Sequence, residues 1–368
     1  MPLKADFCKH TLNFKFNAGT SRGVLKTRDA WFLKVWDEKT AQVYGIGEAA
    51  PLKGLSTDDR EDFDTFWGQL ISRINDSEYT REDLLEQINE TEFQAWPSVR
   101  FAIETALKDL DLGGKRKVFK GPFFDQNLPI EINGLVWMGD EKFMSSQIES
   151  KLSDGYKTIK MKIGAIDLDT EMKLLRGIRK SFTSNQLTLR VDANGAFNPD
   201  EAREVLRELA RLEIHSIEQP IRAGQWEEMA RLCKDAAVDI ALDEELIEIY
   251  KVQKKILLDL IKPQFLIFKP TLLGGFGQTD EWINLCQPRK INWWMTSALE
   301  SNIGLNAICQ YTDSKKVILP QGLGTGQLYH NNIPSPLRVS EGQIKYSPEG
   351  KWDLSLLNFP SEANSRLF

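Results

Sequence analysis

Apolar and polar residues follow two different periods in two parts of this chain. Residues 12–16 and 30–36 alternate between apolar and polar side chains, and residues 44–51 form a third run that ends in a turn, which predicts strands. The polar, glycine-containing residues 17–29 between the first two runs predict a mobile loop. Helical spacing follows at residues 58–88 and 97–112. Strands followed by helices predict a small α+β unit.

From about residue 128 the pattern becomes a repeat in which short β-branched runs alternate with amphipathic helices. The central positions of the runs lie 24 to 29 residues apart, which predicts eight βα units and therefore a closed barrel. The expected strands are residues 130–135, 158–163, 188–192, 216–219, 239–243, 265–269, 292–296 and 316–320. We therefore divide the chain into residues 1–127, a barrel at 128–322, and a tail at 323–368 that is expected to return to the first unit.

Composition and charge exclude several classes of protein. The chain has 368 residues, 41% hydrophobic and 27% charged, with a net charge of −6 and no long run of one sign. This is typical of a soluble globular protein and argues against a nucleic-acid partner. No apolar run approaches the ~20 residues that span a membrane, and residues 1–6 lack a signal-peptide core. We expect a cytoplasmic protein with no membrane partner.

Histidine and cysteine are too scarce to carry the chemistry. Three histidines and four cysteines are scattered without the spacing of a zinc site. The cysteines predict reduced, mostly buried thiols. Acid–base chemistry is therefore expected from lysine and carboxylate side chains.

Three consecutive predicted strands end in a carboxylate, at Asp192, Glu218 and Asp243. A barrel carries its active site at the carboxyl ends of its strands, and neighbouring strands lie ~4.8 Å apart, so these side chains can converge. Three buried carboxylates repel one another unless a cation lies between them. All-oxygen ligation predicts Mg²⁺ first and Mn²⁺ second.

Lysines stand on both sides of this run of acids. Lys160 and Lys162 are two residues apart on one strand and face the same way, whereas Lys269 ends a strand on the opposite side of the ring. A nearby cation favours the neutral form of a lysine, which can then remove a proton. One such residue alone would be an ordinary helix cap or surface group. Five charged strand ends in one repeat favour a site that forms an enolate from a carboxylate substrate.

These motifs resemble a known family. Lys160-Met-Lys162, Asp192-Ala-Asn194, Glu218-Gln219-Pro220, Asp243-Glu244 and Lys269-Pro270 are similar to those of the muconate-lactonizing subgroup of the enolase superfamily. Residues 45–52 and 97–110 resemble segments of that subgroup's capping domain. The resemblance implies an α/β fold, a (β/α)₈-type barrel with an α+β capping domain formed by the N-terminal region and the C-terminal tail.

Within the subgroup, the segments at residues 23–29 and 132–139 are similar to the o-succinylbenzoate synthase family. Residues 297–304 resemble the SSxESxxG segment of the subgroup, with Ala298 in place of a serine. The related dipeptide epimerases usually carry Asp-x-Asp where this chain has Gly322-Leu-Gly324. The resemblance thus implies a carbon–oxygen lyase of menaquinone biosynthesis, which converts the small-molecule carboxylate 2-succinyl-6-hydroxy-2,4-cyclohexadiene-1-carboxylate into o-succinylbenzoate by syn dehydration.

The same resemblance implies a role for each site residue. Asp192, Glu218 and Asp243 would hold Mg²⁺, with Mn²⁺ as a possible substitute. Lys162 would remove the α-proton and later protonate the departing hydroxide, while Lys269 would stabilise the enolate from the other face. The implied substrate contacts are Lys160, Arg190, Asn194, Ser297, Ser301, Gly322 and Gly324.

Other interpretations stay open at this point. Two lysines on opposite faces could also catalyse the reaction of an N-succinylamino acid racemase or a dipeptide epimerase. A third possibility is a non-catalytic binding protein with a decayed site. Arg190 could form a salt bridge inside the barrel, and Glu300 could orient loops. The glycines at 274–275 and 322–326 could bind phosphate, although neither cluster has the P-loop pattern.

Overall fold

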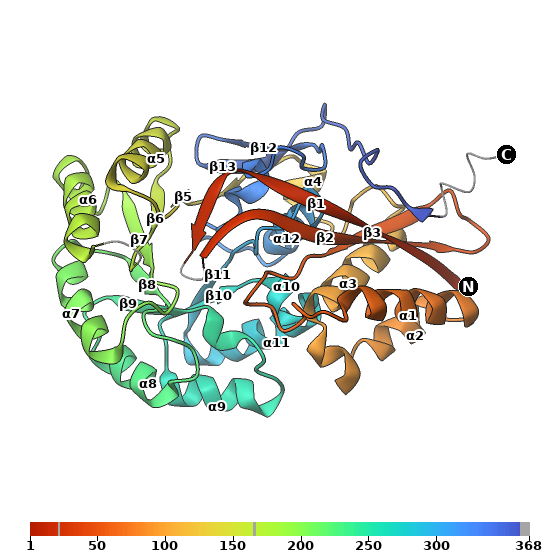
Figure 1. Ribbon diagram of the computed structural model, residues 1–368, viewed down its shortest axis with the longest axis horizontal. Coiled ribbons are helices and arrows are strands. Elements are labelled where there is room, and N and C mark those ends of the chain that lie inside the picture. Colours follow the sequence, from red (N-terminus) through yellow and green to blue (C-terminus); the bar gives the residue numbers. More distant parts are fainter. Residues whose placement is uncertain (21–22, 165–166, 361–368) are drawn as a thin grey trace.

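The computed structural model describes residues 1–20, 23–164 and 167–360 (Figure 1). The strands are β1 (Leu3–Thr20), β2 (Gly23–Asp37), β3 (Tyr44–Ala49), β4 (Ile130–Glu131), β5 (Gly134–Val136), β6 (Thr158–Lys162), β7 (Thr188–Asp192), β8 (Ser216–Glu218), β9 (Asp239–Leu242), β10 (Phe265–Phe268), β11 (Asn292–Met295), β12 (Leu337–Ser340) and β13 (Gln343–Tyr346). The helices are α1 (Phe63–Asp76), α2 (Arg81–Gln87), α3 (Pro97–Asp111), α4 (Pro122–Asp125), α5 (Glu141–Ser153), α6 (Leu168–Ser181), α7 (Pro199–Ala210), α8 (Trp226–Asp235), α9 (Val252–Ile261), α10 (Pro270–Leu273), α11 (Gly275–Cys286) and α12 (Asn302–Ser314).

The N-terminal part is an antiparallel sheet of β1, β2 and β3 with helices packed on it. Helix α3 lies very close to β3, where the sequence is Gly45-Ile-Gly47. A Cβ atom at Gly45 would lie 1.8 Å from the Ala106 carbonyl oxygen, and one at Gly47 would lie 1.8 Å from that of Ala102. Glycine at both positions therefore permits this close contact.

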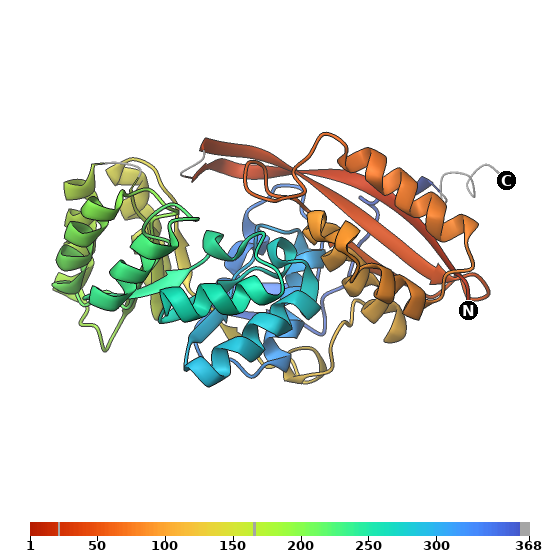
Figure 2. The ribbon, with the colours of Figure 1, turned by 90° about the horizontal axis from the view of Figure 1, so that it is seen from below.

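Of the expected loop at residues 17–29, residues 17–20 and 23–29 are strand instead, and residues 21–22 lie outside the described part of the chain. β1 and β2 form a long hairpin whose pairing shifts between Asn13 and Ala18. Within the shifted segment Phe14 bridges to Tyr329, and further along Gly19 bridges to Met138. The hairpin extends beyond β3 toward the barrel (Figure 2). The polar, glycine-containing stretch is strand because its two arms pair with each other, and Gly19 adds a bridge to the barrel at Met138.

The second sheet is parallel and runs in the order β11-β10-β9-β8-β7-β6-β5, with helices outside it. This is a TIM-type α/β fold, and the six predicted strands from residue 158 to 296 are confirmed to within two residues. The first expected strand is divided, because Ile130 and Glu131 pair with β13 while the barrel strand begins at Gly134.

The expected eighth strand at residues 316–320 is wrong. Helix α12 continues to Ser314, and Ile318 is 94% exposed. The chain reaches the sheet only at Gln321 and Gly322, which form parallel bridges to Ile132 and Thr296. Two edges of the sheet are thus linked through this short segment, which begins three residues after Ile318, the centre of the expected strand.

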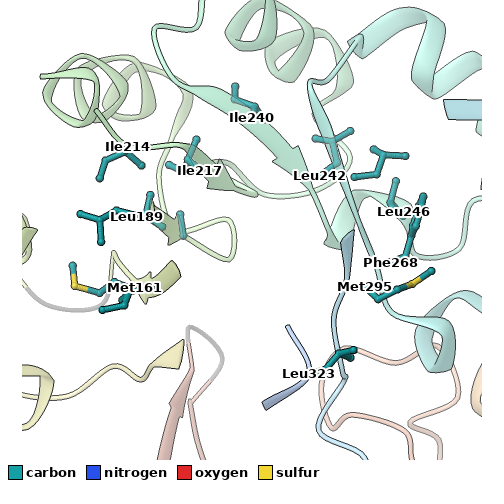
Figure 3. Close-up of a cluster of buried hydrophobic side chains, with 14 of the residues drawn as sticks. Met161, Leu189, Ile214, Ile217, Ile240, Leu242, Leu246, Phe268, Met295 and Leu323 are labelled. Carbon is teal, nitrogen blue, oxygen red and sulfur yellow. The ribbon is translucent and has the colours of Figure 1, made fainter. Parts of the chain in front are cut away.

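Alternation along the strands separates an apolar outer face from a polar inner face. On β6, Met161 is fully buried between the sheet and the helices, whereas Lys160 and Lys162 on either side of it face inward, two residues apart. Figure 3 shows part of this apolar cluster, with labelled side chains from successive strands that include Leu189, Ile217 and Phe268.

The chain after the barrel contacts both parts of the molecule. Strand β13 pairs with both β12 and β4, while Leu357 and Phe359 pack in one apolar cluster with Phe32 and Ile46 of the N-terminal sheet. Within the described residues, none of the helices is long and apolar enough to cross a lipid bilayer.

Candidate active site

The parallel register brings the predicted carboxylates to one edge of the sheet. Lys162 pairs with Asp192 across β6 and β7, and Asp192 pairs with Glu218 across β7 and β8. Asp243 directly follows β9. Asp192 and Glu218 are 1% exposed and Asp243 is 3% exposed, so all three carboxylates lie in the barrel away from bulk water.

Three lysine ammonium groups lie among these carboxylates. Lys160 Nζ is 2.9 Å from Asp192 Oδ2 and 2.8 Å from Glu218 Oε2. Lys162 Nζ is 3.0 Å from Asp192 Oδ2. Lys269 Nζ contacts Asp243 Oδ2 and lies 4.0 Å from Glu218 Oε1. The sequence-based expectation that these charged groups converge is therefore correct.

Burial and ion pairing set the charges of these groups. Burial alone would raise the pKa of Asp192, but Lys160 and Lys162 outweigh it and hold that pKa well below its usual range. Burial raises the pKa of Asp243 well above its usual value, and Lys269 opposes this only in part. Burial lowers the pKa of Lys160, but Asp192 and Glu218 more than reverse the effect. The charges of Asp192 and Asp243 thus depend on the lysines beside them.

The three carboxylates offer only oxygen ligands, which a hard cation such as Mg²⁺ prefers. Among the described residues, no group of three His, Cys, Asp or Glu side chains is arranged as a metal centre as it stands, and here lysine ammonium groups contact the carboxylate oxygens. Glu218 Oε1, however, is buried without a hydrogen-bond partner. A buried carboxylate oxygen requires a partner, and an all-carboxylate set on neighbouring strands suits Mg²⁺.

A cavity of about 720 Å³ opens beside these groups. The predicted site residues that line it are Lys160, Lys162, Asp192, Asn194, Lys269, Ser297, Gly322 and Gly324. Phe16 and Leu25 of the hairpin and Leu52 after β3 complete the wall. The cavity therefore lies between the barrel and the N-terminal sheet, with apolar residues facing the charged groups.

Two predicted substrate contacts, Arg190 and Ser301, do not line this cavity. The Arg190 guanidinium lies 3.9 Å from the Trp294 ring centroid and donates to the Pro320 carbonyl, 2.8 Å away. Burial lowers the pKa of Arg190 to about 10. Within the described part of the chain it forms no salt bridge, so the alternative of a salt bridge inside the barrel does not match its position.

Ser301 instead begins helix α12. Its hydroxyl accepts a hydrogen bond from the Ile303 amide and donates to Glu48, 2.5 Å away. Glu48 also accepts from the backbone amides of Ser301 and Gly304 at 2.8 Å. A carboxylate at a helix N-terminus is favourable. Serine is a favoured residue at a helix N-terminus, but the partner Glu48 lies 253 residues away.

Neighbouring side chains hold the predicted substrate contacts Asn194 and Ser297 in place. Asn194 Oδ1 accepts from Lys162 at 2.5 Å, and its amide donates to Glu244 at 3.0 Å. Ser297 donates to Glu300 at 2.5 Å and accepts from Thr325 at 2.8 Å. Glu300 therefore orients the loop that carries Ser297. This position agrees with the interpretation, left open by the sequence, that Glu300 orients loops.

Fold and site together define an α/β-barrel enzyme of the enolase type. The enolase C-terminal domain-like family model matches residues 144–350. The chain is 44% identical to o-succinylbenzoate synthase from Desulfotalea psychrophila, in an alignment that covers 94% of this chain and 99% of that protein. The crystal structure of MenC from the same organism matches with a TM-score of 0.82 at 40% identity, covering 94% of this chain and 100% of that chain.

The chain belongs to the o-succinylbenzoate synthase family of the enolase superfamily. The predicted family is therefore confirmed, and with it the prediction of an enzyme of the lyase class. The structure of N-succinyl Arg/Lys racemase from Bacillus cereus also matches, with a TM-score of 0.81 at 19% identity over 100% of this chain and 98% of that chain. At that identity the likeness shows only a shared fold.

Proposed function

We propose that this chain catalyses the syn dehydration of 2-succinyl-6-hydroxy-2,4-cyclohexadiene-1-carboxylate to o-succinylbenzoate, a step of menaquinone biosynthesis. Membership of the o-succinylbenzoate synthase family supports this reaction. The observation that carries the chemistry is the position of Lys162, which lines the cavity beside Asp192 and Asn194.

Asp192, Glu218 and Asp243 are the proposed ligands of Mg²⁺, with Mn²⁺ as a substitute. When bound there, the cation supplies positive charge next to the substrate carboxylate and so favours loss of the neighbouring proton. Lys160 is hydrogen-bonded to two of these carboxylates. In our proposal its ammonium keeps the excess negative charge of the site low when the anionic substrate enters.

Lys162 carries both proton transfers in this proposal. Its neutral amine takes the hydrogen from C1 of the ring, and the resulting ammonium returns that proton to the hydroxyl leaving C6, so that water departs and the C1–C6 double bond completes the aromatic ring. Because one base acts on one face, the elimination is syn. Asn194 holds Lys162 through a 2.5 Å hydrogen bond, and Lys269, on the other side of the site, stabilises the enolate by its charge.

The succinyl arm is proposed to lie along Ser297, Gly322 and Gly324. A Cβ atom at Gly322 would lie 2.6 Å from Thr296 Oγ1, so a larger residue there would displace the cavity wall. Residues 1–127 with the tail 323–368 would serve as the capping domain, because the hairpin residues Phe16 and Leu25 close one side of the cavity.

The test is a direct assay. Purified protein with Mg²⁺ and the cyclohexadiene substrate should produce the absorbance of the aromatic product. Lys162→Ala should retain the wild-type circular dichroism spectrum and lose at least about 100-fold in rate, since a general base contributes about 10²–10⁴-fold. Absence of product from folded, metal-loaded wild-type protein would exclude the proposed reaction.

A second candidate is N-succinylamino acid racemase activity at the same site. It is favoured by the presence of Lys162 and Lys269 on different strands of one cavity, because two bases can remove and return a proton on opposite faces. Exchange of the α-hydrogen of N-succinyl amino acids in deuterated water, followed by NMR, distinguishes this activity from dehydration. Gly322 and Gly324 replace the Asp-x-Asp segment of dipeptide epimerases and disfavour that substrate class.

A further inference from the structure

Gln219 is the residue directly after Glu218, and neither the proposed reaction nor the cavity uses its side chain. It is fully buried, and its φ of +42° places it in the left-handed region. A non-glycine residue held in this region costs about 1–3 kcal/mol. Such a strained backbone persists only where surrounding contacts hold the residue in place. The contacts of Gln219 therefore indicate which parts of the site this residue holds together.

The Gln219 side-chain amide is hydrogen-bonded on both of its ends. Oε1 accepts from the backbone amides of Asp243 at 3.2 Å and Glu245 at 3.3 Å. Nε2 donates to the Ile221 carbonyl at 2.9 Å and to Glu245 Oε2 at 3.0 Å. The amide therefore connects the loop after β8 to the loop after β9, and one of its partners is the backbone of Asp243 itself.

The same residue connects a third loop through its backbone. The Gly195 amide donates to the Gln219 carbonyl at 2.7 Å, and the Gln219 amide donates to Ala241 at 2.9 Å. Gly195 lies in the loop after Asp192. Glu245 extends the arrangement by accepting from the Gly224 amide at 2.7 Å, and it is 2% exposed.

We propose that Gln219 is a positioning residue that fixes the relative placement of Asp192, Glu218 and Asp243 through its contacts with the three loops that follow them. It touches neither substrate nor metal and acts through the backbone. A glutamine is required because the position must accept two hydrogen bonds and donate two. This inference rests on the proposed function, since it concerns the carboxylates assigned there to Mg²⁺.

The experiment measures metal affinity separately from activity. Binding of Mn²⁺ to wild type, Gln219→Met and Gln219→Glu is measured by calorimetry on the full chain, together with the melting temperature. Gln310→Met is the matched control, because Gln310 is also buried and its amide also makes four hydrogen bonds, to Arg116, Asn306, Val118 and Phe119. It lies on α12 and contacts none of the three loops.

We expect Gln219→Met to weaken Mn²⁺ binding by about 10–100-fold, the usual effect of removing a group that orients metal ligands. Gln310→Met should lower the melting temperature to a similar degree and leave Mn²⁺ binding unchanged. Gln219→Glu keeps the two accepted hydrogen bonds but faces Glu245, and should give an intermediate loss. The double variant Gln219→Glu/Glu245→Gln restores an amide–carboxylate pair and should recover part of the affinity.

The outcomes separate the two proposals. If wild type binds no divalent ion, the proposed function fails. If wild type binds Mn²⁺ and the Gln219 variants bind it as tightly as Gln310→Met does, the positioning role is wrong and Gln219 serves stability alone. Should Gln219→Met not fold, Gln219→Glu and the double variant decide the matter by the same comparison.

Discussion

Replacing Glu48 tests how the N-terminal sheet is attached to the barrel. Glu48 is fully buried and accepts three hydrogen bonds at the start of α12, from Ser301 N, Ser301 Oγ and Gly304 N. Glu48→Ala leaves the two backbone amides without acceptors, at about 1–3 kcal/mol each. Burial raises the pKa of Glu48, so removing the carboxylate also recovers part of a desolvation cost.

We therefore expect a net loss of about 3 kcal/mol in the free energy of unfolding. At about 2 °C per kcal/mol for a large chain, the melting temperature should fall by about 6 °C. Calorimetry and urea denaturation measure this change. Glu149→Ala is the control, since Glu149 is exposed on α5 and its loss should change the free energy by less than about 0.5 kcal/mol. Equal unfolding midpoints for the two variants would refute the view that Glu48 secures α12.

Three further predictions follow from the same structure. Gly47→Ala places a Cβ atom 1.8 Å from the Ala102 carbonyl oxygen and should cost more than about 3 kcal/mol of stability, measured by urea denaturation; a near-normal midpoint would contradict this. Burial raises the pKa of Glu104 to about 7 from 4.5, so the folded state binds this proton more tightly and the associated stability, about 3 kcal/mol, is present below pH 4.5 and lost as the pH rises through 7. Glu104→Gln should remove this loss of stability between pH 5 and pH 8, which urea denaturation of both proteins at the two pH values measures. If the variant loses as much stability as wild type between these pH values, the assignment to Glu104 is wrong. Chelation of divalent ions should abolish dehydration without unfolding the protein, because lysines then balance Asp192 and Asp243 as in this structure, and circular dichroism checks the fold.

The local sequence determined much of this protein. The spacing of the apolar runs predicted six barrel strands to within two residues, because a parallel βα repeat has nearly constant length. It also predicted that Asp192, Glu218, Asp243 and the lysines would converge, because the ends of parallel strands share one edge of the sheet. These properties depend on the order of residues along one strand or between neighbours.

Features that join distant segments were decided only by the tertiary structure. The stretch at residues 17–29 has a polar, loop-like pattern, and only the pairing of β1 with β2, with the bridge from Gly19 to Met138, makes its described residues strand. The apolar Ile318 suggested a strand, yet the chain joins the sheet three residues later. The resemblance implies a substrate contact at Ser301, and only the tertiary structure brings Glu48 to its hydroxyl. Hydrogen bonds between groups far apart in sequence leave no periodic signal, because each depends on how the folded elements pack together and not on the residues nearby in the chain.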